Sequence, residues 1–311
     1  MHRVLGKDND MGSQFWWFYD VLAAAVILVC AFVWGRKGAL KGTFAAVGGI
    51  LSVLLAFGIS GAVSDGLRQV TVKSGDVRKL EQHITPDAFC NEMAVYLENM
   101  GYSIRVDRKK LGEILDKTDI QYDEAIAKYI NNINSQRLEE DIQTLTEKVH
   151  EGYAVAVGEM VGESLSKFVA ETAADEVRKN PEMMQELIPL LRQEVSKNAA
   201  DYIGEHCTAP AYRTMFRLAA FAALFLVFWL ALAAVIKSFA GGRDGGSAAG
   251  AANHIIGAVT GAAAGAIVLL AIAAAVRLSA VMGSNEMLFF NNRAVDKSVV
   301  FKYFYGIIEK M

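Results

Sequence analysis

Hydrophobic and polar residues follow one another in long blocks along this chain, and four apolar blocks are long enough to cross a membrane. They cover residues 15–34, 43–63, 218–236 and 255–276, and Asp20 is the only charged residue in any of them. A helix rises about 1.5 Å per residue, so about 20 apolar residues span a hydrocarbon core of about 30 Å. We therefore predict four transmembrane helices.

The spacing of the four runs predicts how they connect. Eight residues, 35–42, separate the first two runs, and a Gly-rich stretch at 241–247 separates the last two. Connections this short join antiparallel neighbours, so we expect one hairpin over 15–63 and another over 213–282.

Basic residues in the first turn predict the orientation of the hairpins. The turn contains Arg36, Lys37, Gly38 and Lys41 and no acid. Cytoplasmic loops carry an excess of Lys and Arg, which places this turn in the cytoplasm. The opposite, extracytoplasmic side would then hold the polar segment 1–14, the amphipathic tail 283–311 and the segment between the hairpins. In that tail and beside the third run, further Lys and Arg residues count against this orientation.

The segment between the hairpins, residues 64–210, is polar and acidic. It contains 27 Asp and Glu against 17 Lys and Arg, a net charge of −10, whereas the whole chain carries −3. Such a surface argues against nucleic acid as a partner, because phosphate binding requires basic residues.

Helical signals dominate residues 64–210. Thr85 followed by Pro86 predicts a helix start, and a stripe of apolar residues at helical spacing follows it. We expect one long helix over 135–179, and a strand-like piece only at 102–106. The fold predicted for the chain is therefore all-α, a four-helix transmembrane bundle of two antiparallel hairpins with an inserted soluble helical domain.

Three glycines in the last run predict a packing seam. Gly257, Gly261 and Gly265 recur every fourth residue and therefore share one helix face. Without side chains at these positions, another helix can approach backbone to backbone.

Asp20 is a carboxylate inside a predicted span, where it is costly unless paired or hydrated. Arg277 and Arg217 lie at similar distances from the outer ends of their spans, so we expect an ion pair between Asp20 and one of them. The alternative is a proton or cation site on a transport path. Against it, the spans offer few other polar residues: Ser52, Ser60 and Thr260.

Cys90 and Cys207 lie near opposite ends of the inserted domain, where an oxidising exterior would permit a disulfide between them. The alternatives are two unpaired thiols, or a zinc site completed by His83 and His206, whose spacing matches no known ligand pattern.

Conventional enzyme motifs are absent from the sequence. It has no Walker loop, nucleophile elbow, His-Glu-x-x-His or dinucleotide fingerprint. We therefore predict a protein that is not an enzyme and uses no metal or cofactor.

Two motifs resemble the colicin V production protein (CvpA) family. Asp20 precedes Lys37-Gly38-Ala39-Leu40-Lys41, like the family's opening span and turn, and residues 253–265 resemble its Asp-Arg-Leu-Leu-Gly-x-x-x-Gly-x-x-x-Gly entry to the last span. The chain departs from the pattern at Asn253 and His254, which replace the acid-base pair, and at Ala264, where a basic residue is usual. The resemblance covers about residues 15–63 and 213–311 and leaves the inserted domain out.

The resemblance implies a multi-pass protein of the bacterial cytoplasmic membrane, associated with toxin (colicin V-type) production or export and with envelope maintenance. The family has no assigned catalytic residue. We expect an accessory or scaffold that works with a membrane or envelope protein partner. The competing expectation is a small transporter or channel built from the four-helix bundle, as a single chain or as a homo-oligomer.

Overall fold

The computed structural model describes residues 15–71, 73–101, 104–134, 141–193, 195–240, 250–282 and 292–310. Within these ranges the regular elements are helices, and no strand forms. The chain divides into two compact units, one made of residues up to Leu67 and from Thr214 onward, the other of Arg68–Arg213. We refer to them as the membrane unit and the middle unit.

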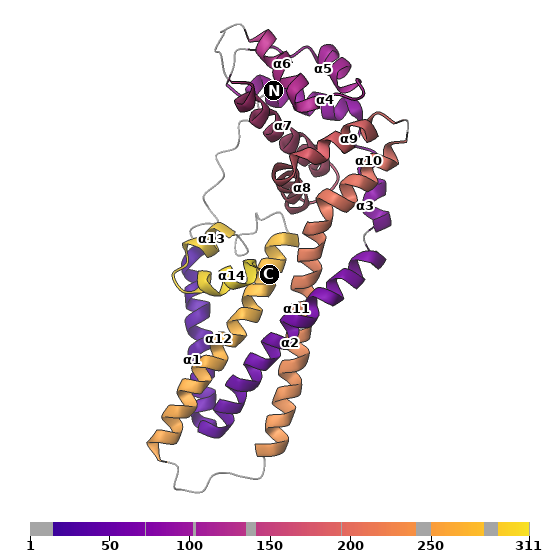
Figure 1. Ribbon diagram of the computed structural model, residues 1–311. Helices are drawn as coiled ribbons and strands as arrows, with labels where there is room; N and C mark the ends of the chain where they lie inside the picture. The colour runs from indigo at the N-terminus through magenta and orange to yellow at the C-terminus, as the bar shows by residue number, and fades with distance from the viewer. Residues whose placement is uncertain are drawn as a thin grey trace. The chain divides into compact units, whose positions relative to one another are not determined.

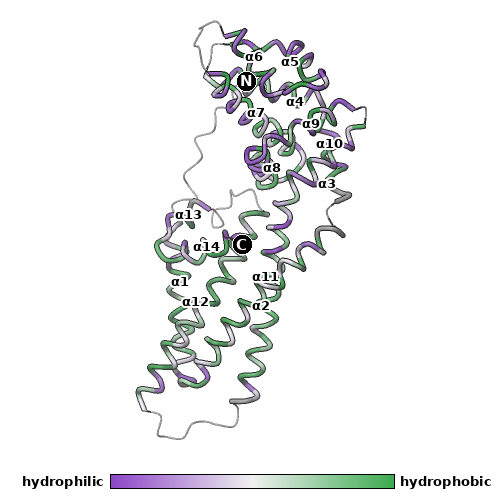
Figure 2. The backbone as a smooth tube through the Cα atoms, in the orientation of Figure 1, coloured by the Kyte–Doolittle hydropathy of each residue, from purple (hydrophilic) through white to green (hydrophobic). Residues whose placement is uncertain are grey.

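Within the described part of the chain, four helices are long and apolar enough to cross a membrane, as predicted. They are α1 (Trp16–Lys37), α2 (Ala39–Thr71), α11 (Ala209–Ala240) and α12 (Ala251–Met282). Figure 2 shows hydrophobic residues along the middle of each, with polar residues toward the ends. The helices are longer than the apolar runs because their polar ends stay helical.

The turn between α1 and α2 is much shorter than expected. Gly38 alone separates the two helices, with φ of +87°, and its N–H donates to the carbonyls of Trp34 and Gly35. The left-handed region is accessible to glycine without the steric cost that a Cβ imposes. The eight-residue turn predicted at 35–42 is therefore a single-residue break between two helices.

Close contacts at glycines define the direction of each neighbouring helix. The contacts of α1 with α12 run in opposite order along the two helices, so these helices are antiparallel. The contacts of α2 with α12 run in the same order, which makes them parallel, and those of α2 with α11 run in opposite order, which makes them antiparallel. The contacts are Gly35 with Ala258, Ile27 with Gly265, Gly42 with Gly257, Gly49 with Ile267, Gly48 with Leu232, and Phe57 with Arg217. The four helices therefore form an alternating up-and-down bundle.

Two short helices complete the membrane unit, α13 (Asn292–Lys297) and α14 (Phe301–Glu309). In Figure 1 they lie at the end of the unit where α1 begins and α12 ends. The α14 helix buries Phe301, Tyr305 and Ile308, and the Phe301 ring stacks on Tyr19 of α1 at 5.0 Å. The tail is thereby part of the core of the membrane unit.

The middle unit is built from shorter, amphipathic helices. They are α3 (Lys73–Leu80), α4 (Pro86–Asn99), α5 (Arg108–Leu115), α6 (Tyr122–Ile133), α7 (Ile142–Gly162), α8 (Lys167–Lys179), α9 (Met184–Leu191) and α10 (Ser196–Ile203), with a 3-10 turn at Pro181–Met183 and a π-turn at Gly204–Thr208. Local caps begin two of them: Thr85 accepts from the N–H of Ala88, and Asp107 accepts from that of Lys109.

The prediction of one continuous helix over 135–179 is wrong. Residues 135–140 lie outside the described part of the chain, and a turn at 163–166 then divides α7 from α8. The break allows α8 to fold back on α7, where a Cβ on Gly158 would lie 3.0 Å from Ala174 Cβ. Packing the apolar faces of α7 and α8 against each other stabilises the fold more than one continuous helix with a half-exposed apolar face would.

The strand-like piece expected at 102–106 does not form a strand over its described residues. Residues 102 and 103 lie outside the described part of the chain, and 104–106 have no regular structure. Ile104 and Val106 are buried, so their β-branched side chains serve the helical core.

Candidate functional site

The glycine seam of α12 lies directly against α1. A Cβ added at Gly257 would come within 2.8 Å of the Trp34 carbonyl oxygen, and one at Gly261 within 2.6 Å of the Cys30 carbonyl oxygen. At Gly265 the nearest atoms are Cβ of Cys30 and Cα of Ile27, both at 3.0 Å. Backbone meets backbone at this seam, and the surface is filled by a helix of the same chain.

The start of α12 holds the break between α1 and α2. The Asn253 side-chain oxygen accepts the N–H of Ala39 at 2.8 Å, the first residue of α2. His254 Nδ1 lies 2.8 Å from the carbonyl oxygen of Gly35, near the end of α1, and must donate there because a carbonyl only accepts. The first bond satisfies an orphan N–H at the start of α2, and the second gives the Gly35 carbonyl a second donor beside the Gly38 N–H. A Cβ on Gly38 would lie 2.8 Å from Asn253 Nδ2, so glycine is required there for space as well as for its φ.

The basic residues of this turn lie along aromatic rings of α1. The Lys37 ammonium is 4.3 Å from the Trp34 ring centre, and the Arg36 guanidinium is 5.6 Å from that of Phe32. Such contacts let long basic side chains extend from an apolar helix toward a polar interface.

At the other end of α1, Asp20 caps α14. Its carboxylate accepts the backbone N–H groups of Val299, Val300 and Phe301, at 2.7, 2.8 and 3.2 Å. The next N–H, that of Lys302, donates to the hydroxyl of Ser298 at 2.9 Å. The unpaired amides of a helix start carry partial positive charge, so an anion is stabilised there.

The predicted ion pair between Asp20 and Arg277 is wrong. The Arg277 guanidinium donates to the Tyr305 hydroxyl at 3.3 Å and lies 3.4 Å from Glu309, both on α14. Arg217, the other expected partner, lies over the Phe57 ring at 4.9 Å. Amides of a distant segment, which periodicity does not reveal, take the place of the expected arginine.

The disulfide considered between Cys90 and Cys207 is not formed, and both thiols are free and buried. The Cys90 thiol donates to the carbonyl of Arg108 at 3.4 Å, and burial, followed by the charge of Asp87, raises the pKa of this thiol. Cys207 belongs to the π-turn, whose packing partners include α8 and α10. Within the described ranges, no group of three or more His, Cys, Asp or Glu side chains is placed to hold a metal ion.

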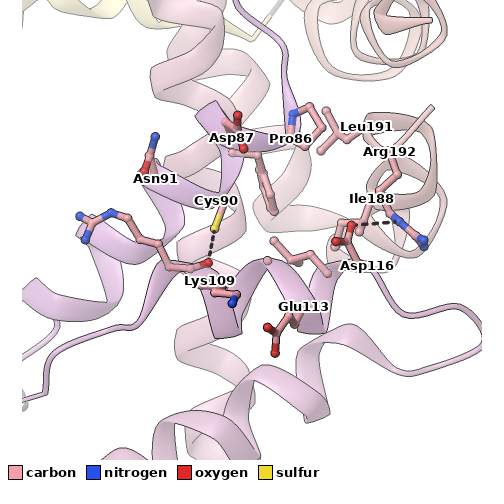
Figure 3. A pocket seen from close by; sticks show the side chains of 14 residues that line it. Pro86, Asp87, Cys90, Asn91, Lys109, Glu113, Asp116, Ile188, Leu191 and Arg192 are labelled. Carbon is pink, nitrogen blue, oxygen red and sulfur yellow. Dashed lines mark hydrogen bonds and ion pairs between the residues drawn. The ribbon is translucent and has the colours of Figure 1, made fainter. Parts of the chain in front are cut away.

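An open cleft of about 600 Å³ lies in the middle unit, between α4, α5 and α9 (Figure 3). Its floor is apolar and buried, formed by Phe89, Leu115, Ile188 and Leu191. Its rim is charged, with Asp87, Lys109 and Glu113 exposed and Asp116 paired with Arg192 at 3.5 Å. Sequence reasoning missed this cleft because its walls are about 75 residues apart and no local motif marks them.

The chain was compared with models of protein families, with curated proteins and with solved structures, and nothing in the three comparisons matches it.

Proposed function

We propose that this chain is a CvpA-like multi-pass protein of the bacterial cytoplasmic membrane, and that it acts as a non-enzymatic accessory or scaffold in toxin (colicin V-type) production or export, or in envelope maintenance. The residues that carry the resemblance support this proposal by their positions. The seam glycines contact α1, Asp20 joins α1 to the start of α14, and Gly38 and Asn253 meet where α12 contacts the break between α1 and α2.

The observation that carries a scaffold role is how the polar side chains of the spans are used. Eight of them bond to backbone, either of their own helix or of a neighbouring segment, whereas Arg277 bonds to the Tyr305 hydroxyl and lies 3.4 Å from Glu309. Ser52, Ser60, Ser64, Thr260 and Ser279 donate to carbonyls three or four residues earlier, and Asp20, Asn253 and His254 bond neighbouring segments. A conduction path needs polar groups that face a shared space. Here the hydroxyls bond to their own helices, and Asp20, Asn253 and His254 hold neighbouring segments together.

The charge distribution of the membrane unit supports the orientation proposed. The end with the α1–α2 break carries Arg36, Lys37 and Lys41, and α11 adds Lys237 at that same end. The other end mixes acids and bases. Asp20 lies there at the start of α14, and Glu309 lies beside Arg277. By the positive-inside rule, this difference supports a cytoplasmic position for the break and an outer position for residues 64–210.

The proposed partner is a membrane or envelope protein that meets the middle unit. Its surface is acidic, and its cleft combines an apolar floor with unpaired charges on the rim, a composition suited to a protein segment. The same negative charge makes nucleic acid a poor partner, because phosphate binding requires basic residues.

Two measurements test the proposed role. In cells that lack this protein, export of a colicin V-type toxin or resistance of the envelope to detergent should fall, and the wild-type chain should restore it. Purified protein in sealed vesicles should pass ions and small solutes no faster than protein-free vesicles. Flux that requires Asp20 and is lost in Asp20→Asn would instead identify a transporter or channel.

Location is tested separately. Protease added to intact cells with a permeabilised outer layer should cleave within residues 64–210, and the same segment should be protected in inverted membranes. The reverse pattern would overturn the orientation.

A further inference from the structure

The α14 helix has apolar residues on two opposite faces. One face, Phe301, Tyr305 and Ile308, is buried against the membrane unit. The other holds Val300, Tyr303 and Ile307, which are 42%, 68% and 57% exposed. Residues three and seven apart share a helix face, so these three form one continuous stripe. Lys302 and Glu309 lie on the strip between the two faces.

The depth of α14 relative to the spans is set by two attachments. Its first amides bond Asp20, four residues into α1, which is about 6 Å along the axis. Its last turn meets Arg277, five residues before the end of α12, or about 7.5 Å. Both attachments lie just inside the ends of the spans, at the level where Trp16 and Trp17 are exposed. Exposed tryptophans at that position are typical of the membrane interface.

The outward stripe adjoins the lipid-facing surface of the bundle. Val21, the neighbour of Asp20, is 56% exposed, and further exposed apolar residues continue along α1 to Leu28 at 67%. Because Asp20 is bonded to the start of α14, the stripe begins beside this surface. A single lipid boundary would cover both.

We propose that α14 is an interfacial membrane helix, whose Val300, Tyr303 and Ile307 insert at the boundary between lipid headgroups and acyl chains, with Asp20 holding the helix at that depth. This inference goes beyond the scaffold role and rests on the spans lying in a bilayer. A helix that is apolar on nearly all sides is stable only when both faces are covered, and the covering available at this depth is lipid.

Spin labels on single added cysteines test the proposal in the full chain, reconstituted in phosphatidylcholine and phosphatidylglycerol vesicles. The labelled variants are Tyr303→Cys and Ile307→Cys, with Leu28→Cys as the lipid reference and Glu147→Cys of α7 as the water reference. Unmodified protein, with its three native cysteines, measures background labelling. The readout is the ratio of collision rates with oxygen, which concentrates in lipid, and with a water-soluble nickel complex.

We expect ratios at 303 and 307 several-fold above that at 147 and approaching that at 28. Water-like ratios at both positions, with Leu28 lipid-like, would overturn the interfacial helix and leave the scaffold proposal standing. Immobilised labels with dipolar broadening between chains would also overturn it, by identifying a second copy as the covering. A water-like ratio at Leu28 would remove the membrane placement on which both proposals rest.

Discussion

The two units of this protein contain helix contacts of different kinds. In the membrane unit, α1 and α12 meet where side chains are missing, at Gly257, Gly261 and Gly265. In the middle unit, helices meet through large buried side chains such as Phe89 and Tyr153, whose rings stack at 6.2 Å. Water drives large apolar side chains together, whereas lipid does not, so helices in lipid are held by close backbone contact.

The contacts made by charged side chains also differ between the two units. The middle unit carries exposed ion pairs, such as Arg178 with Glu151 at 2.7 Å and Lys128 with Glu124 at 3.0 Å. Pairs of this kind contribute little in water. In the membrane unit the carboxylate of Asp20 bonds to three backbone amides. Removing a polar contact should therefore cost more in the membrane unit than on the surface of the middle unit.

The largest effect is expected where a side chain is added to the glycine seam. In Gly261→Leu the new Cβ would meet the Cys30 carbonyl oxygen at 2.6 Å, and the rest of the side chain would force α1 and α12 apart. We expect little or no monodisperse protein in detergent, measured by size-exclusion chromatography and thermal unfolding.

Gly58→Leu is the matched control for the seam. Gly58 lies on α2, and a Cβ there has no atom within 4 Å among the described residues. This variant should purify and unfold like the wild type. Equal damage from both substitutions would mean that glycine is needed for the helices themselves and not for their contact.

In the middle unit the opposite change, removal of a side chain, should be damaging. Phe89 is 1% exposed, and Phe89→Ala should cost about 3–5 kcal/mol because it leaves a cavity in the core. The free energy of unfolding in urea, followed by circular dichroism, measures this. Val95→Ala, on an exposed site of the same helix, should change it by less than about 0.5 kcal/mol. If Phe89→Ala left the free energy of unfolding unchanged, the middle unit would not be stabilised mainly by its apolar core.

A smaller effect is expected at the cap of α14. Asp20→Ala leaves three amides without their acceptor and should cost about 1–2 kcal/mol, the range of a lost helix cap. Asp20→Asn should cost less, because an amide oxygen still accepts. Limited proteolysis of detergent-purified protein should cut earlier in the tail in Asp20→Ala. Glu309→Gln, which weakens the half-exposed contact with Arg277, is the control and should leave the cutting rate near that of wild type.

The smallest effect is an electrostatic one on the middle unit. Burial, followed by the charges of Glu159 and Glu163, raises the pKa of Glu92. A carboxyl whose folded pKa is raised stabilises the fold below its unfolded pKa, and this contribution is lost as pH rises through the folded value. Glu92→Gln should therefore raise the thermal midpoint at pH 7, and the gain should disappear below about pH 4.5. A gain that persists at low pH would mean that packing, not charge, is responsible.

Local patterns determined much of the fold. The four spans follow from runs of about 20 apolar residues, and the register of the seam follows from the four-residue spacing of its glycines. The helix start at Thr85 was also readable, because a cap bonds to an amide a few residues away. In each case the interacting groups are close in sequence or repeat at the helical period.

Contacts between distant segments were decided by the tertiary structure. Asp20 was recognisable as a charge inside a predicted span, but its partners lie about 280 residues away and are backbone amides, which carry no side-chain signature. The bond from Asn253 to the amide of Ala39, the turn between α7 and α8, and the cleft floor depend in the same way on which helices meet. A sequence reveals which groups need a partner, because burial and charge are properties of residue type. Which partner each group obtains depends on how the helices pack, and that is settled only when the whole chain is folded.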